Sequence, residues 1–344
     1  MVKKNILCLG GSLNQTSQLH QITRHLEDEY NIYFTQIYGS GFFFKLLAES
    51  GISDNTVLGK NSSFTAKSLE YIKANHLKYD YRGETLGIDY DLLLVSTDLV
   101  FPKRLKHKKI AWVQEGMIDP PMPFGKWIKK LRLPLYFTGD TSLNGTSNIA
   151  DIYFSMSQGY KKYFVQNGTD ENKILTTGIP NFDNIEELKN NPLKERDYVL
   201  VATSDIRELG GNDDRIDFIK KCLKIANGKK LIFKPHPNEN LYRVTQEILK
   251  EAPRAEIVTK VNLDHMIANC DILITQFSSC VYLGLVLGKV VYSYFTMEDL
   301  ESKKPIQNHG KSSEIIAKIL KEFILYEGNK SDFILQSEYA KQFL

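Results

Sequence analysis

Short apolar runs, each followed by a stretch with helical spacing, are the feature that most limits how this chain can fold. The runs 92–95 (Leu-Leu-Leu-Val) and 199–202 (Val-Leu-Val-Ala) contain no alternating polar residues. Continuous apolar runs of this length are typical of strands buried on both faces, as in parallel sheets. Between such runs, segments such as Thr16–Glu29 carry leucine and isoleucine at helical spacing. The pattern predicts an α/β protein with parallel sheets.

The alternation of strands and helices occurs twice along the chain, which points to two domains. The chain has 344 residues, a length that suggests two domains. Between the halves, residues 181–196 are polar and charged and include Pro192, as expected of an interdomain connection. We therefore expect a first domain over residues 1–185 and a second over residues 196–328.

Composition narrows the class of protein. The net charge of +3 gives no reason to expect nucleic-acid binding. The 4 cysteines lack CxxC spacing and lie in apolar settings, so they read as reduced core thiols. No apolar run reaches the roughly 18–20 residues of a membrane span. The apolar start of the chain is broken by Gly10-Gly11, which favours a first strand over a signal peptide. We expect a cytoplasmic protein.

The stretch Lys234–Glu239 (Lys-Pro-His-Pro-Asn-Glu) is a candidate phosphate site. It follows an apolar run and precedes a helix-like segment, which places it at the carboxyl end of a strand, where open α/β sheets bind ligands. The two prolines restrict the backbone around His236. Lys234 and His236 beside the start of a helix are suited to holding a phosphate. The alternative is a turn whose histidine caps the helix.

Two other strand ends carry polar side chains. Glu115 and Gly116 follow the strand 110–113, where a carboxylate beside a glycine is a candidate general acid or base. Ser278 and Ser279 open a helix after another strand and offer hydroxyls and free backbone N–H groups. The alternatives are a capping or salt-bridged Glu115 and a serine N-cap.

Glycines after the first strand form a third candidate contact. Gly11, in the pair Gly10-Gly11, could let the backbone approach a ligand. The pair lacks the full G-x-G-x-x-G pattern, so simple turn chemistry is the alternative. We keep Gly11 and Gly116 as candidate acceptor contacts.

The series Glu115-Gly116, His236-Pro237 and Ser278-Ser279 resembles that of the two-domain GT-B glycosyltransferases that build bacterial surface polysaccharides. It is similar to sialyltransferases, polysialyltransferases and the Kdo transferases of capsule and lipopolysaccharide synthesis. The resemblance runs from about residue 110 to residue 294, through short motifs only. It implies two Rossmann-like domains facing across a cleft, with the acceptor in the first and the donor nucleotide in the second. It also implies that a C-terminal helix over residues 329–344 packs back toward the first domain.

The resemblance also implies roles for individual residues. Glu115 would act in acid/base chemistry on the acceptor hydroxyl, and the side chains that would bind the donor phosphate are His236, Ser278 and Ser279. We hypothesise transfer of Kdo or a related ulosonic acid from a CMP-activated donor to a lipopolysaccharide or capsule glycan. No metal or other cofactor is expected, since lysine, histidine and helix amides can offset the charge of the leaving phosphate.

A residue in the loop after the first strand of the second domain distinguishes a retaining from an inverting mechanism. Retaining Kdo transferases carry an aspartate nucleophile at this place, where this chain has Asp205. An inverting enzyme would need only one base, Glu115. Asp205 could instead cap the region 213–214 or pair with Arg207. Arg207 or Lys234 could bind a sugar carboxylate, because arginine presents a planar fork to such groups.

Other families with similar motifs provide alternatives. CDP-glycerol glycerophosphotransferases have a similar Lys-Pro-His and Ser-Ser pattern, and other UDP-sugar-dependent GT-B transferases share the fold. UDP-GlcNAc 2-epimerases carry His-Pro-Asn but usually show Ser-Gly-Gly where this chain has Ser278-Ser279-Cys280. A nucleotide-sugar-binding protein without activity is the non-enzyme alternative. The donor base, sugar, acceptor, linkage, stereochemistry and oligomeric state stay open.

Two basic segments, 103–109 and 126–132, suggest a surface for anionic partners. In the second segment Trp127, Ile128 and Leu131 can share one helical face, flanked by lysine and arginine. Such helices lie on anionic membranes. We hypothesise peripheral contact with the inner face of the membrane. The alternative is a solvated helix packed by its tryptophan.

Overall fold

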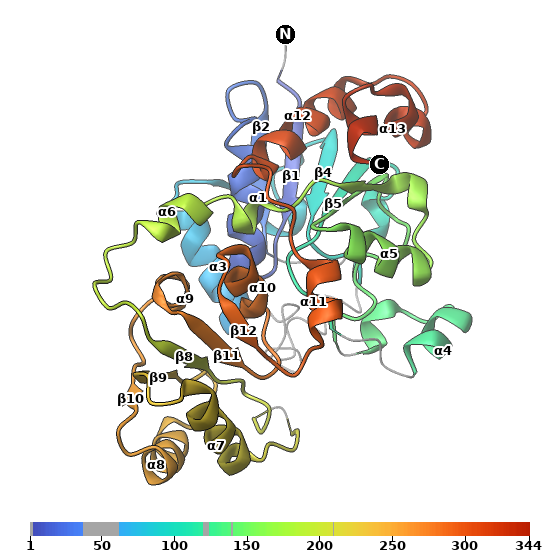
Figure 1. The fold of residues 1–344 in the computed structure, drawn as a ribbon. Coiled ribbons are helices and arrows are strands. Elements are labelled where there is room, and N and C mark those ends of the chain that lie inside the picture. The colour runs from blue at the N-terminus through green and yellow to red at the C-terminus, as the bar shows by residue number, and fades with distance from the viewer. Residues whose placement is uncertain (1–2, 37–61, 120–123, 139, 209) are drawn as a thin grey trace. The chain divides into compact units, whose positions relative to one another are not determined.

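The computed structural model describes residues 3–36, 62–119, 124–138, 140–208 and 210–344 (Figure 1). The chain divides into two compact units. Unit 1 comprises Met1–Asp183 and Ile306–Leu344, and unit 2 comprises Asn184–Pro305. Each unit is built on its own sheet, and every strand pairing in the described residues is parallel. Both sheets therefore agree with the fold class that the apolar runs predict.

Unit 1 contains a 7-stranded sheet in the order β3-β2-β1-β4-β5-β6-β7. Its strands are β1 (Asn5–Leu9), β2 (Asn31–Thr35), β3 (Lys78–Tyr79), β4 (Leu92–Val95), β5 (Lys109–Val113), β6 (Ile152–Ser155) and β7 (Ile174–Thr176). Its helices are α1 (Leu13–Thr23), α3 (Ser63–Ala74), α4 (Gly125–Lys130), α5 (Gln158–Gln166), α12 (Ser312–Leu325) and α13 (Phe333–Gln336). The strand order reverses beside β1, which places β1 and β4 at the switch point of the sheet.

Unit 2 contains a 5-stranded sheet in the order β10-β9-β8-β11-β12. Its strands are β8 (Val199–Ala202), β9 (Leu231–Lys234), β10 (Glu256–Ile257), β11 (Ile272–Thr275) and β12 (Val290–Tyr292). Its helices are α6 (Ile185–Lys189), α7 (Arg215–Ala226), α8 (Leu241–Glu251), α9 (Leu263–Asn269), α10 (Cys280–Val286) and α11 (Met297–Lys303). The switch point of this sheet lies between β8 and β11.

The helix α12 belongs to unit 1, although the sequence placed residues up to 328 in the second domain. Asp183 accepts the backbone N–H groups of Ser312 and Ser313 at 2.9 and 2.8 Å, which caps the start of the helix. At its other end, Lys109 donates to the carbonyls of Phe323 and Tyr326 at 2.7 and 2.6 Å. A carboxylate at the amino end and a lysine at the carboxyl end both complement the helix dipole. Unit 2 therefore ends at Pro305.

The C-terminal segment is not one helix over residues 329–344. It forms the short helix α13, breaks at Ser337, and ends in a 3₁₀ turn over Ala340–Phe343. Ser337 has extended backbone angles, and its hydroxyl accepts the N–H of Ala340 at 2.9 Å. It also donates to Glu322 at 2.6 Å. A serine that bonds to nearby backbone competes with the helix, which explains the break.

Large apolar side chains fill the space on the two faces of each sheet. In unit 1 the rings of Trp112 and Phe164 are in edge contact at 5.3 Å between centroids. In unit 2 a cluster that includes Val199, Phe218 and Phe233 packs between β8, β9 and the helices α7 and α8. Strands sandwiched in this way must be apolar on both faces, which is why their sequences do not alternate.

The four cysteines are free. Burial raises the pKa of Cys222 and Cys270 to about 12, so these thiols stay protonated at neutral pH. The expectation of reduced thiols agrees with this setting. In the part of the chain that the structure describes, no helix is both long enough and apolar enough to span a bilayer.

Candidate functional site

The carboxyl edge of the unit 2 sheet brings together three of the residues that the sequence analysis singled out. The strands β9, β8 and β11 are neighbours in that order. The loops that follow them carry His236, Asp205 and Ser278, respectively. Because the carboxyl ends of parallel strands lie at one edge, these loops flank one another at the position where α/β sheets bind ligands.

His236 presents one imidazole nitrogen outward. Its Nδ1 accepts the N–H of Asn238 at 3.3 Å and lies 3.4 Å from Oδ2 of Asp205. A neutral ring whose Nδ1 accepts carries its proton on Nε2, and an imidazolium carries protons on both nitrogens. In both forms, as assigned from these partners, Nε2–H is a donor. The side chain is 38% exposed, so this donor can reach a ligand.

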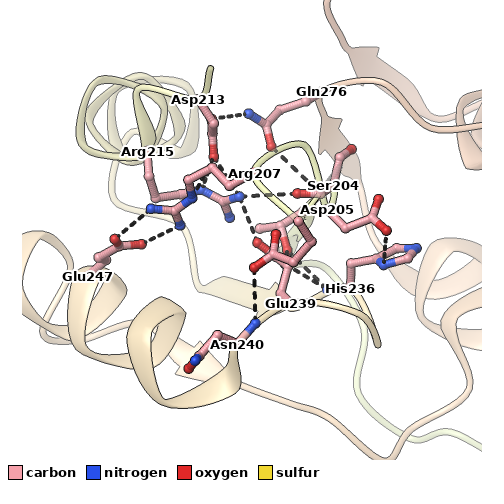
Figure 2. Close-up of polar contacts among 12 residues, drawn as sticks. Ser204, Asp205, Arg207, Asp213, Arg215, His236, Glu239, Asn240, Glu247 and Gln276 are labelled. Atoms are coloured by element: carbon pink, nitrogen blue, oxygen red, sulfur yellow. Dashed lines mark hydrogen bonds and ion pairs between the residues drawn. The ribbon is translucent and has the colours of Figure 1, made fainter. Parts of the chain in front are cut away.

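A buried ion-pair network centred on Arg215 holds the His236 loop in place (Figure 2). The side chain of Arg215 is 2% exposed. It donates to Glu239 at 2.7 Å and to Asp213 at 2.8 Å, and both carboxylates are 1% exposed. Glu239 in turn accepts the backbone N–H of His236 at 2.9 Å. Arg215, at the start of α7, thus fixes the backbone that carries the imidazole.

The same network reaches the other two loops of this edge. Gln276, which follows β11, donates to Asp213 at 2.6 Å and accepts the N–H of Ser204 at 3.4 Å. Arg215 also donates to the carbonyl of Ser204 at 3.2 Å. The loops after β8, β9 and β11 are therefore joined through one buried arginine. Such a supporting shell preorganises the groups that face a ligand.

Arg207 and Lys234 are both engaged within unit 2. Arg207 forms a two-pronged ion pair with Glu247, at 2.8 and 2.7 Å. The hydrogen bonds of this pair raise the pKa of Arg207 and lower that of Glu247. Lys234 donates to the carbonyl of Thr259, and burial lowers its pKa. A sugar carboxylate would have to displace Glu247 to reach the fork of Arg207.

Asp205 does not make the structural contacts that the sequence analysis considered. Its carboxylate accepts a hydrogen bond from the side-chain amide of Asn238 at 2.7 Å and faces His236. No ion pair joins it to Arg207 within the described residues. Its side chain is 15% exposed. This placement makes Asp205 a neighbour of the imidazole at the edge where a donor would lie.

Ser278 and Ser279 lie directly before α10, which is only 7 residues long. Ser278 is half-buried, and its hydroxyl accepts the N–H of Cys280 at 3.4 Å. Ser279 is the N-cap residue, yet its side chain makes no capping bond and is exposed. The simple N-cap alternative therefore does not describe Ser279. Burial raises the pKa of the Cys280 thiol next to it.

In unit 1, Glu115 follows β5 and is held by the start of α1. Its carboxylate accepts hydrogen bonds from Asn14 at 2.9 Å, Gln15 at 2.7 Å and the hydroxyl of Ser12 at 3.3 Å. Glu115 is half-buried. All three of these donors are uncharged, and no salt bridge to Glu115 occurs in the described residues. The salt-bridge alternative therefore does not describe Glu115.

The glycines near Glu115 have different structural roles. The N–H of Gly11 donates to Oε1 of Gln15 at 2.8 Å, which aims the amide of Gln15 at Glu115. A Cβ at Gly10 would lie 2.8 Å from Thr16, so this glycine permits close packing of β1 and α1. A Cβ at Gly116 would meet nothing within 4 Å. Gly116 therefore lies beside open space, in agreement with room for a ligand.

In the two basic segments, some side chains make contacts within the fold and others are exposed. In 103–109, Arg104 pairs with Glu84 at 3.0 Å and Lys108 pairs with Asp89 at 2.5 Å. Lys109 caps α12, as described above. In 126–132, Trp127 is 60% exposed, so the alternative of a helix packed by its tryptophan is wrong. The buried residues of this helix are Gly125 and Ile128.

The sequence analysis missed the residues that support the site, above all Arg215, Asp213 and Gln276. Arg215 reads as an ordinary charged residue at the start of a helix, where arginine is normally exposed. One signal was present: Glu239 stands three residues after His236, in the same motif. In the described residues, no group of three or more His, Cys, Asp or Glu is placed to hold a metal.

Solved structures with the same architecture provide a comparison. A UDP-GlcNAc 2-epimerase from Neisseria meningitidis, bound to UDP-GlcNAc, is 12% identical with a TM-score of 0.55, covering 92% of this chain and 99% of that chain. MnaA of S. aureus, in complex with UDP, is 14% identical with a TM-score of 0.54, and the match covers 95% of this chain and 89% of that chain. The wall teichoic acid polymerase TagF, soaked with CDPG, is 14% identical with a TM-score of 0.50, and the match covers 94% of this chain and 89% of that chain.

These likenesses concern the fold, since the identities are low. No protein-family model matches the sequence, and neither does any curated protein sequence. The structural neighbours share two Rossmann-like domains of the GT-B type, which are also the two units of this chain. The expected fold class is confirmed.

Proposed function

We propose that this protein is a GT-B transferase whose donor is activated by a nucleoside diphosphate, either a UDP-sugar or CDP-glycerol. Unit 2 would bind the donor through the Nε2–H of His236 and the hydroxyls of Ser278 and Ser279. The observation that carries the proposal is the preorganised edge of unit 2, where Arg215 holds three loops around an outward-facing imidazole donor. Fixed donors aimed at a phosphate stabilise the charge that develops as it leaves.

The arrangement favours a diphosphate-linked donor over the CMP-linked ulosonic acid of the sequence hypothesis. A ulosonic acid carries a carboxylate, and the arginine expected to bind it is already paired with Glu247 through two nitrogens. Lys234 is likewise bonded to Thr259. The neighbouring structures were obtained with UDP, UDP-GlcNAc or CDPG. Transfer of Kdo or a sialic-type sugar remains the second candidate, for which the motif series alone argues.

Glu115 is proposed as the base that takes the proton of the acceptor hydroxyl. Three neutral donors orient its carboxylate without neutralising it. Such donors fix the position of the carboxylate oxygens, which a base needs in order to reach the acceptor hydroxyl. This role separates a transferase from a protein that only binds nucleotide sugars, because the binding protein needs no base.

Epimerisation of a UDP-sugar is the alternative within the same fold. The structural neighbours include UDP-GlcNAc 2-epimerases. The sequence argues against it, since Ser279 and Cys280 stand where epimerases usually carry two glycines. Incubation with UDP-GlcNAc in the absence of an acceptor decides the question. Formation of a second UDP-sugar, detected by NMR, would establish epimerase activity.

The nucleotide test is thermal unfolding in the presence of UDP, CDP, GDP and CMP. We expect UDP or CDP to stabilise the protein, by about 2.7 kcal/mol at a concentration 100 times its Kd. His236→Asn should remove most of this stabilisation, and His265→Asn, a change elsewhere in unit 2, should not. Stabilisation by CMP with none by UDP or CDP would restore the CMP-ulosonic hypothesis. A response to no nucleotide would refute both.

A further inference from the structure

A cavity of about 710 Å³ in unit 1 lies between the two basic segments. Its lining includes Phe101 and Lys103 from the chain after β4, and Arg132 and Tyr136 from the chain after α4. The sequence could not show that the two segments meet, because residues 110–125 separate them. A cavity of this size accommodates a ligand of small-molecule dimensions. Nothing in the proposed donor chemistry of unit 2 uses it.

The charge of this cavity is strongly positive. Four cationic side chains line it: Lys103, Lys106, Lys129 and Arg132. Of these, Lys129 is engaged within the unit, since it donates a hydrogen bond to the carbonyl of Thr146 at 2.9 Å. The side chains of Lys103, Lys106 and Arg132 are exposed and make no hydrogen bond or ion pair with any described residue. Three cations are therefore left to bind a ligand.

The one carboxylate in the lining does not offset these charges. Asp98 accepts hydrogen bonds from the N–H of Gly145 at 2.7 Å and from the hydroxyl of Ser147 at 2.7 Å. It also accepts from the hydroxyl of Tyr153 at 3.2 Å. Asp98 is 4% exposed, and its hydrogen bonds hold the backbone of residues 145–147 in place. An anion in the cavity would thus meet cations that have no competing partner.

Exposed apolar side chains occur in the same segment that supplies part of the cavity wall. The segment from α4 to the 3₁₀ helix over Leu135–Thr138 exposes Trp127 by 60%, Leu131 by 62%, Leu133 by 41% and Phe137 by 55%. Leu133 also lines the cavity. Large apolar side chains gathered in one short segment indicate an interaction site. Basic residues flanked by tryptophan and leucine are typical of surfaces that lie in a membrane interface.

We propose that this cavity binds the phosphate-bearing head group of an anionic lipid. Lys103, Lys106 and Arg132 would contact the phosphate, and Trp127, Leu131 and Phe137 would enter the interfacial layer of the bilayer. Lysine and arginine both bind phosphate oxygens through charge-assisted hydrogen bonds. A free sugar phosphate would satisfy the cations but would leave the apolar side chains in water. The combination of the two features therefore selects a lipid.

The position of the cavity relates it to the chemistry of unit 1. Residues 98–101 of its wall follow β4, and Glu115 follows the neighbouring strand β5. Both lie after the carboxyl ends of adjacent strands. A lipid held here would be bound by the unit to which we assign the acceptor. The proposal itself does not rest on the assignment of a transferase, because it uses only the charge and exposure of unit 1.

Vesicle sedimentation tests the role of the cations. The full chain is mixed with vesicles of phosphatidylcholine alone, or of phosphatidylcholine with phosphatidylglycerol. We expect binding only to the anionic vesicles. The triple variant Lys103→Gln/Lys106→Gln/Arg132→Gln should bind about a hundredfold more weakly, since each basic residue near an anionic surface contributes about a fivefold factor. The triple Lys67→Gln/Lys73→Gln/Lys162→Gln removes the same charge from exposed positions elsewhere in unit 1. It should bind nearly as well as the wild type.

A second variant tests the apolar side chains, and a soluble probe tests the source of the phosphate. Trp127→Ser/Leu131→Ser should weaken vesicle binding about tenfold, and Phe64→Ser/Leu86→Ser, at exposed positions outside the segment, should not. Glycerol 3-phosphate should compete only weakly. The lipid proposal is overturned by absence of binding to anionic vesicles, or by equal weakening in both charge triples. Tight binding of glycerol 3-phosphate without vesicle binding would replace the lipid by a soluble phosphate ligand.

Discussion

Two carboxylates follow strands of the two sheets, Glu115 after β5 and Glu239 after β9, and the protein holds them differently. Glu115 is half-buried and is bound only by uncharged donors from the start of α1. Glu239 is 1% exposed and is bound by the guanidinium of Arg215. Glu115 therefore has no cationic partner in the described residues, whereas Glu239 is a fixed acceptor for a buried arginine. The difference supports the proposed role of Glu115 as a base and makes Glu239 part of the structure that holds the His236 loop.

The largest effect is expected from removing the arginine. Arg215→Met would leave Glu239 buried without a cation and Asp213 with only the more distant Arg207, at 3.7 Å, and breaking a buried pair in this way costs about 3–5 kcal/mol. Denaturant unfolding should show this loss, and nucleotide binding should weaken because the His236 loop is released. The exposed Arg254→Met is the control and should change stability by less than about 0.5 kcal/mol. A loss below about 1 kcal/mol for Arg215→Met would remove the supporting role.

Glu115→Gln should act on turnover instead of stability. We expect transfer to slow by about 10²–10⁴-fold, the contribution of a positioned acid or base. Unfolding should change by only about 1.5 kcal/mol, since one hydrogen bond to the carboxylate, from Gln15, is lost. Nucleotide-induced stabilisation should be unchanged. Glu70→Gln, an exposed change in α3, is the matched control. Full transferase turnover in the Glu115 variant would contradict a catalytic role for this residue, whereas absence of transfer in the unchanged protein would favour a binding protein or an epimerase.

The two units should also respond to acid over different ranges. Burial, helped by Arg24, lowers the pKa of His20 in unit 1 to about 4 from 6.5. Below pH 6.5 the unfolded chain therefore takes up a proton that the native unit excludes, and stability falls, by at most ~3 kcal/mol, as the pH approaches 4. In unit 2, Arg207 lowers the pKa of Glu247 below 4.5. The stability from this pair is present above that value and is lost only as the pH falls through the lowered pKa.

Hydrogen exchange measured by mass spectrometry between pH 7 and 4 can follow each unit separately. We expect unit 1 to lose protection first, and His20→Gln to flatten that loss. An unchanged pH response in His20→Gln would show that other groups control the acid stability of unit 1.

The smallest effect is expected for Asp205→Asn. If Asp205 orients His236, losing its negative charge should weaken nucleotide affinity and turnover about tenfold, the size of one charge-assisted hydrogen bond. Asn238→Ala, which removes a partner of the same carboxylate oxygen, should give a change of similar size. A much larger loss of turnover with intact nucleotide affinity would instead support the nucleophile hypothesis. Trapping a glycosyl adduct on Asp205 would then establish the retaining route.

Much of the fold could be predicted from local sequence. Runs such as 92–95 and 199–202 had to be strands in a parallel sheet, because only strands covered on both faces are apolar at every position. The same reasoning placed Glu115, His236 and Ser278 at strand ends. It failed where a distant contact decides the outcome. Ser337 ends a helix through Glu322, and Asp183 draws α12 into unit 1.

The sequence by itself determined the two parallel sheets and the loops that carry the candidate chemistry, because apolar runs and turn residues act locally. Tertiary structure alone decided which charged residues remain available. Arg207, Lys234 and Lys109 are engaged within their units, while Lys103, Lys106 and Arg132 surround a cavity. A charge is expensive to bury unless it finds a partner, and the partner lies far away in the chain. No local pattern can show whether that partner exists.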